Sequence, residues 1–289
     1  MSNGSSNGSS VMPVVLTIAG FDPCSGAGIA ADLKTLAAND CYGVAAISAL
    51  TVQNSSGVRS VEPVRSKILG EMLQAIAEDV HLAAVKIGMI GNAENARVVA
   101  AFLQKLEVPV VLDPVVQSSS GSVLLDEKGL KELRGQLMSR ATVITPNLAE
   151  AALLVGFPVT NVDEMKKAAT ELVAAGARAV VVTGGHLGKP VDVLFDGQNC
   201  VMLPGDRVKT NHTHGTGCAF SSALAAGLAL GKSLAESAVL AKAFVFTALE
   251  RSFAVGNGPG SPDYLYRLHP NQFFRAGGAE PHHMETGHR

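Results

Sequence analysis

The chain has 289 residues, of which 47% are apolar and 17% are charged, and its net charge is −2. This length fits one or two domains, and the apolar share is ample for a buried core. Basic residues are nearly balanced by acidic ones and Trp is absent, so we expect no nucleic-acid partner.

Apolar runs of strand length alternate with helical patterns along the chain. The polar leader, residues 1–12, has no secretory pattern and is expected to be disordered. Runs rich in Val and Ile predict strands at 14–19, 44–50, 83–87, 108–112, 142–145, 179–182 and 191–195. Helices are predicted at 29–38, 67–77, 94–106, 127–138, 148–155, 163–175, 219–230 and 234–251. The alternation predicts one α/β domain over residues 13–269 with a mostly parallel sheet, and a loosely ordered tail at 270–289.

The apolar runs and the cysteines indicate where the protein resides. No apolar run reaches the roughly 20 residues that a membrane span needs, so no membrane association is expected. The four cysteines are spread along the chain without a C-x-x-C pair. This pattern is typical of reduced thiols, and we therefore expect a cytoplasmic protein.

Polar segments follow the predicted strands. In chain order they read "GFDPCSGAG", "TVQN", "GMIGN", "DPVVQSSSG", "PNLAE" and "GGH". Because ligands of such sheets bind beyond the carboxyl ends of the strands, these segments predict an active site at that edge.

Three further motifs have weaker interpretations. Residues 26–31, "GAGIAA", fit a dinucleotide-binding turn, but no acid lies about 20 residues further on, which favours a tight turn or a backbone surface for a small substrate. Residues 227–233 lack the spacing of a P-loop; there Gly231 predicts a helix stop, and Ser233 with Glu236 predicts a capping box. His212, His214 and Cys218 are candidate zinc ligands, but no second pair accompanies them, which favours two loop histidines.

The stretch "HTHGTGC", residues 212–218, leads from a glycine-rich turn into a predicted helix. The N–H groups of residues 216–218 can point into one concavity, and the helix N-terminus adds positive potential, so an anion site is predicted. The same terminus is expected to lower the pKa of the Cys218 thiol. The alternative is a glycine-rich turn with a buried, inert cysteine.

Several segments, in order, resemble the hydroxymethylpyrimidine and hydroxymethylpyrimidine-phosphate kinases of thiamine biosynthesis, within the ribokinase superfamily. They are "LTIAGFDPCSGAGIAADLKTL", "ALTVQN", "KIGMIGN", "LDPVV", "ITPNLAEAALL", "VTGGHL" and "THGTGCAFSSALAA". The resemblance implies a three-layer αβα ribokinase-like fold and a homodimer. It also implies ATP-dependent phosphorylation of 4-amino-5-hydroxymethyl-2-methylpyrimidine and then of its monophosphate, with Mg²⁺.

The resemblance assigns the reacting centre to one turn. Gly215, Thr216, Gly217 and Cys218 would form the anion hole and the catalytic base, since this family carries Cys where the superfamily's G-x-G-D signature has Asp. One turn would then supply both the donors for the transferred phosphoryl group and the acceptor for the hydroxyl proton.

The resemblance also assigns the binding residues. Gln53 would hydrogen-bond to the edge of the pyrimidine, and Met89 would form an apolar wall for the ring. Met89 can also be an ordinary residue of the hydrophobic core. Gly20 and Asp22 would lie near the hydroxymethyl group.

On the nucleotide side, Asn147 and Glu150 would organise Mg²⁺, with Glu150 acting through water, and Thr183 and Gly185 would lie beside ATP. Asn147 can also cap the following helix.

Two lysines that members of this family carry are replaced here by Thr183 and Ser119. Without these lysines, Mg²⁺ and backbone N–H groups would have to contribute more to phosphate binding. The second phosphorylation is therefore less strongly expected. A pyridoxine or pyridoxal kinase is the nearest alternative. A non-catalytic vitamin sensor is disfavoured because Cys218, Asn147 and Glu150 are all present.

Overall fold

A computed structural model of the chain describes residues 11–118 and 121–272, so most of the predicted leader and tail, and Ser119, lie outside the described residues. The strands form one sheet in the order β3-β2-β1-β4-β5-β6-β7-β8-β9. Their bounds are β1 Val14–Phe21, β2 Tyr42–Asn54, β3 Gly57–Pro63, β4 Leu82–Ile87, β5 Val110–Leu112, β6 Val143–Ile144, β7 Val180–Val182, β8 Val191–Phe195 and β9 Cys200–Pro204. Strands β1, β2 and β4 to β7 pair in parallel, and β3, β8 and β9 pair antiparallel, which confirms the mostly parallel sheet.

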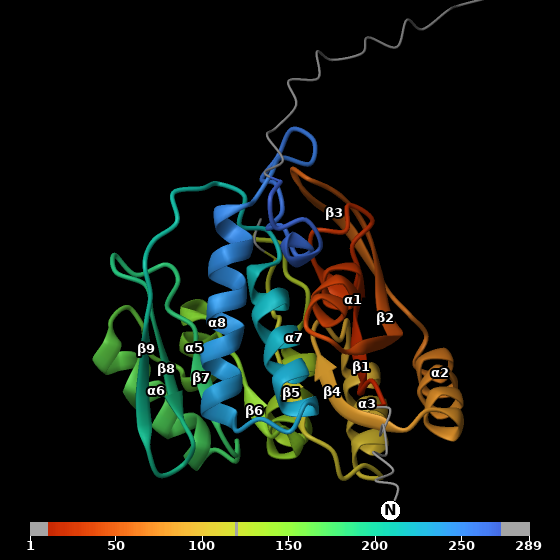
Figure 1. The fold of residues 1–289 in the computed structure, drawn as a ribbon. Coiled ribbons are helices and arrows are strands. Elements are labelled where there is room, and N and C mark those ends of the chain that lie inside the picture. The colour runs from red at the N-terminus through yellow and green to blue at the C-terminus, as the bar shows by residue number, and fades with distance from the viewer. Residues whose placement is uncertain (1–10, 119–120, 273–289) are drawn as a thin grey trace, which may run out of the picture.

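Helices cover both faces of the sheet. Their bounds are α1 Gly28–Ala38, α2 Ser66–Asp79, α3 Ala93–Leu103, α4 Glu127–Glu132, α5 Leu148–Val155, α6 Val162–Ala174, α7 Thr216–Ala229 and α8 Leu234–Glu250. Helices α1, α7 and α8 lie on one face, and the remaining helices lie on the other (Figure 1). The predicted three-layer α/β arrangement is confirmed. None of the described helices is long and apolar enough to cross a bilayer.

Alternation along the strands divides the core between the two faces. Val111 and Val181 pack on the side of α1, α7 and α8, whereas their neighbours Leu112 and Val182 pack on the opposite side, and all four are fully buried. Strands buried on both faces need apolar residues at successive positions, which is why they were visible as continuous apolar runs.

The two edge strands were missed. β3 pairs only with β2, and β9 only with β8, and most of their side chains are partly or fully exposed. The β3 segment mixes charged, polar and apolar residues, so the apolar pattern did not reveal it, whereas the β9 segment is an apolar run that the prediction overlooked.

Two predicted helices end differently in the structure, and one predicted cap is incomplete. The helix predicted at 127–138 is α4 followed by a π-helical turn, Leu133–Leu137, and a 3-10 turn. The helix predicted at 94–106 ends at Leu103. The capping box predicted for α8 is only half formed: Ser233 accepts from the Glu236 N–H, but the Glu236 carboxylate pairs with Lys232. Gly231, with φ +78°, follows the end of α7 as predicted.

The strand order reverses beside β1. From β1 the chain passes to β2 on one side, and it later returns to β4 on the other side. Such a switch point opens a crevice at the carboxyl ends of the strands, which lie at the top of Figure 1.

Candidate active site

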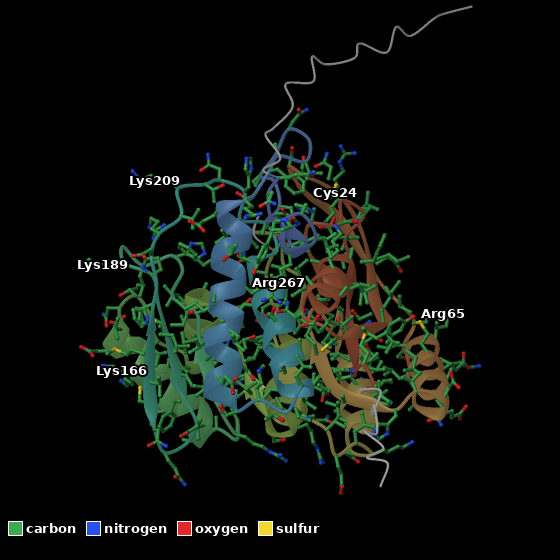
Figure 2. The ribbon with its side chains drawn as sticks, viewed as in Figure 1. Cys24, Arg65, Lys166, Lys189, Lys209 and Arg267 are labelled. Carbon is green, nitrogen blue, oxygen red and sulfur yellow. The ribbon has the colours of Figure 1, made fainter. Side chains whose placement is uncertain are left out.

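A cavity of about 1780 Å³ lies at the carboxyl ends of the parallel strands. Figure 2 shows Cys24, in the loop after β1, and Lys209, in the segment before α7, at this same end of the molecule. Ligand pockets usually measure about 300–1,000 Å³, so this cavity has room for two substrates side by side.

All the residues predicted for the site line this one cavity. They are Gly20, Asp22, Gln53, Met89, Asn147, Glu150, Thr183, Gly185, Gly215, Thr216, Gly217 and Cys218. The structure thus brings together residues that are scattered over the chain, while the role of each remains a prediction.

The turn before α7 is tighter than predicted, because the helix begins at Thr216 instead of residue 219. Gly215 has φ +86°, and a Cβ there would lie 1.8 Å from the Gly26 carbonyl oxygen, so only glycine fits. The Thr216 N–H already donates to the Thr213 carbonyl at 3.3 Å. Three N–H groups, those of residues 216–218, were predicted to bind an anion. Of these, the N–H groups of Gly217 and Cys218, in the first turn of α7, remain available for it.

The expectation of a low thiol pKa at Cys218 is wrong. Burial raises the pKa of Cys218 to about 12, and the negative charges of Asp32 and Asp113 act in the same direction. The positive charge of Lys86 and a hydrogen bond from the Gly28 N–H lower it, but by less. Desolvation of a thiolate therefore outweighs the Lys86 charge and the Gly28 hydrogen bond, and the thiol is protonated near neutral pH.

Asp22 is the centre of the loop after β1. Its carboxylate accepts from the N–H groups of Cys24, Gly26 and Ala27 at 2.8–3.1 Å. One carboxylate oxygen also lies 2.9 Å from Nε2 of His214. Burial alone would raise the pKa of Asp22, but hydrogen bonds with His214 and Gln53 hold it below its ordinary value.

The zinc alternative finds no support at these histidines. His214 pairs with Asp22, and Nδ1 of His212 accepts from the Gly260 N–H at 2.9 Å. Over residues 11–118 and 121–272 there is no group of three His, Cys, Asp or Glu side chains that could hold a metal. His214 lines the cavity beside Asp22.

The turn at residues 26–31 is a tight packing turn. A Cβ on Gly28, whose φ is +56°, would lie 2.1 Å from the Gly20 carbonyl oxygen. Ala27 and Gly28 also line the cavity, so their backbone is accessible to a small ligand.

Two buried carboxylates line the cavity, Asp113 directly after β5 and Glu150 in the first turn of α5. Burial raises the pKa of Asp113 to about 6, and it raises the pKa of Glu150 well above its ordinary value, with the nearby Asp113 charge adding to the effect. Asn147 caps α5 and forms a capping box with Glu150, so its capping role is confirmed. Asp113 was not predicted as a site residue, although an acid directly after a buried strand was the available signal.

A buried ion pair lies beneath the start of α7 and was also missed. Nζ of Lys86, on β4, lies 2.9 Å from both carboxylate oxygens of Asp32, on α1, and both side chains are fully buried. Thr17 and Ser222 donate their hydroxyls to the same carboxylate at 2.6 and 2.8 Å. The pair therefore joins β1, β4, α1 and α7 under the cavity.

Two cations line the side of the cavity beyond β7. Lys242, on α8, lies 2.8 Å from Asp192, which also accepts from the Gly184 N–H at 2.9 Å. Arg207 donates to the carbonyls of Gly185 and Leu187. Thr183 lines the same cavity as these two cations, which the sequence did not point to.

Residues 22–263 match the model of the phosphomethylpyrimidine kinase family. The chain belongs to this family. It is 40% identical over 259 residues to the hydroxymethylpyrimidine/phosphomethylpyrimidine kinase of Rhizobium meliloti, a match that covers 88% of this chain and 97% of that protein.

The fold of this kinase is shared with solved structures. A Bacillus subtilis pyridoxal kinase in complex with ADP aligns with a TM-score of 0.83 and 36% identity, over 89% of this chain and all of that one. A Clostridium difficile phosphomethylpyrimidine kinase aligns with a TM-score of 0.73 and 37% identity, over 82% and 99%. The expected ribokinase-like fold is confirmed.

Proposed function

We propose that this kinase transfers the γ-phosphoryl group of ATP to the hydroxymethyl group of 4-amino-5-hydroxymethyl-2-methylpyrimidine, and then to its monophosphate, in thiamine biosynthesis. The observation that carries the proposal is that the loop around Asp22, Gln53 and the N-terminus of α7 face one cavity large enough for both substrates. Membership of the phosphomethylpyrimidine kinase family supports the choice of acceptor.

The acceptor would lie on the β1–β2 side of the cavity. The amide of Gln53 can donate and accept at once, which suits an aminopyrimidine edge, and Met89 offers an apolar wall. Its hydrogen bonds keep Asp22 ionised, so its carboxylate would accept a hydrogen bond from the pyrimidine substrate or orient Gln53. The N–H groups of Gly217 and Cys218 would hold the oxygens of the transferred phosphoryl group.

The hydroxyl proton has two candidate acceptors. Cys218 is the proposed base, although a thiol with a pKa of about 12 is mostly protonated, so its contribution belongs at the low end for a general base. Asp113, whose pKa is about 6, is ionised at neutral pH, and its Oδ2 would lie 3.8 Å from a Cβ on Gly217. Substitution of Cys218 distinguishes the two.

The residues present fit a divalent cation. Asp113 and Glu150 are buried carboxylates, and the charge of Asp113 adds to the raised pKa of Glu150. The hydroxyl of Thr145, on the same cavity wall, is buried without a partner in the described residues. Mg²⁺ usually takes one or two carboxylates together with waters and substrate phosphates, so the set of three oxygen donors is sufficient. When bound, Mg²⁺ would neutralise the charge of the ATP phosphates.

The test is a comparison of three acceptors with Mg²⁺ and ATP: the hydroxymethylpyrimidine, its monophosphate and pyridoxal. We expect the highest kcat/KM for a pyrimidine acceptor. A higher kcat/KM for pyridoxal would support the second candidate, a pyridoxal kinase, which the closer structural match to a pyridoxal kinase favours. Absence of transfer to all three would support the vitamin sensor.

Two further proposals concern assembly and location. All four cysteines are free, which suits a reducing compartment such as the cytoplasm. Leu50 and Val52 lie exposed near the carboxyl end of β2 and would provide an apolar surface for a homodimer. Light scattering of the purified protein should give twice the chain mass of 29.8 kDa.

A further inference from the structure

Two loops of the site touch each other through their backbones. The first is the substrate loop, residues 20–28, which carries Asp22, and the second is the anion turn, residues 212–218. Gly215 in the anion turn lies so close to Gly26 in the substrate loop that a Cβ would approach the Gly26 carbonyl oxygen to 1.8 Å. The two loops hold different substrates in the proposed function, so their relative position sets the distance between the reacting atoms.

Tyr264 bridges this contact. Its hydroxyl lies 2.6 Å from the carbonyl oxygen of Gly26, in the substrate loop, and 3.1 Å from that of His214, in the anion turn. The Tyr264 side chain is 2% exposed, and a Cβ on Gly215 would lie 2.4 Å from its hydroxyl. Burial raises the pKa of Tyr264 above its ordinary value, so the phenol keeps its proton and donates it between the two carbonyls.

The segment that carries Tyr264 is itself held in place. This C-terminal strap, residues 253–264, is closed by paired backbone hydrogen bonds between Phe253 and Ser261, and the Asp263 N–H donates to the Ala248 carbonyl of α8. Gly258 N–H donates to Ser55, in the turn between β2 and β3, at 3.0 Å. The strap therefore contacts both loops and the β2–β3 turn. These contacts hold Tyr264 in a fixed position.

We propose that Tyr264 is a positioning residue, whose hydroxyl fixes the substrate loop against the anion turn so that the acceptor hydroxyl meets the γ-phosphoryl group in line. In-line transfer needs reacting atoms about 3–3.5 Å apart, and a misplacement of about 1 Å costs up to about 100-fold in rate. Neither substrate needs to touch Tyr264 for this effect. The inference rests on the proposed phosphoryl transfer.

The experiment compares wild type, Tyr264→Phe and the control Tyr266→Phe. Phenylalanine keeps the buried ring of Tyr264 and removes only the hydroxyl that joins the loops. Tyr266 lies two residues further on, stacks on Phe244 of α8 and is not part of the cavity wall, so its variant tests the loss of a nearby phenol hydroxyl. Melting temperatures of all three proteins are measured first, and the assays are run well below the lowest of them.

We expect Tyr264→Phe to lower kcat by about tenfold to 100-fold, with the KM of ATP and of the acceptor changed by less than about threefold. The variant should release more ADP per phosphorylated product, because water can take the place of a displaced acceptor hydroxyl and hydrolyse ATP. Tyr266→Phe should match wild type. A kcat within about twofold of wild type, or a rise in both KM values with kcat kept, would overturn the proposal.

Amide hydrogen exchange supplies a readout that needs no acceptor. Exchange over residues 20–28 and 212–218 should be faster in Tyr264→Phe than in wild type, while exchange in α2 and α3 stays the same. Unchanged exchange in both loops overturns the positioning role even if no acceptor is phosphorylated. If wild type itself transfers no phosphate but both loops loosen in the variant, the proposed function fails and the loop bridge stands.

Discussion

Replacing Lys86 by Met should destabilise the kinase by about 3–5 kcal/mol, because Asp32 then remains buried without its counter-ion. Both side chains have no exposed surface, so water cannot take the place of the ammonium. Thr17 and Ser222 still donate to the Asp32 carboxylate. These neutral donors satisfy two lone pairs but leave the charge uncompensated.

The size of the loss should depend on the second partner. The double variant Lys86→Met/Asp32→Leu removes both charges and should recover most of the stability.

Urea denaturation of wild type, both single variants and the double variant, followed by circular dichroism, measures these differences. Asp32→Leu is expected to be as unstable as Lys86→Met, since it leaves an unpaired buried ammonium. A loss below about 1 kcal/mol in Lys86→Met would show that water or rearrangement compensates Asp32. Equal losses in the single and double variants would refute the argument that an uncompensated charge is the cause.

Four predictions concern the site. Cys218→Ala should lower kcat by about 100-fold with substrate binding kept, and Cys218→Asp should restore part of it; an unchanged rate would leave Asp113 as the proton acceptor. The rate of Cys218 alkylation should rise steadily from about pH 7 to about pH 10, and bound substrate should slow it. A plateau of that rate near neutral pH would contradict the raised pKa of about 12. Gln53→Ala should weaken pyrimidine binding by about 1–3 kcal/mol in calorimetry and leave ATP affinity unchanged, while equal losses would indicate general disturbance. Glu150→Gln should raise the Mg²⁺ concentration needed for half-maximal rate, and normal activity at limiting Mg²⁺ would remove Glu150 from the metal site.

The sequence by itself determined the α/β class, the positions of the buried strands and many of the residues that line the cavity. Strands such as β5, buried on both faces, require successive apolar residues, and this requirement is local enough to read from the chain. The polar segments after the strands are equally local, because parallel strands all end at the same edge. Residues as distant as Gln53 and Glu150 could therefore be placed at one edge without knowledge of the fold, whereas Cys218 was assigned to the site by the family resemblance.

Only the tertiary structure decided the charges and contacts within that cavity. The helix terminus at Cys218 predicted a low thiol pKa, but burial and two carboxylates from other elements raise it. The Lys86–Asp32 pair joins residues 54 positions apart, and Tyr264 reaches Gly26 across 238 positions. Solvation and electrostatic energies depend on which distant groups share a water-excluded volume, and no local pattern records that neighbourhood.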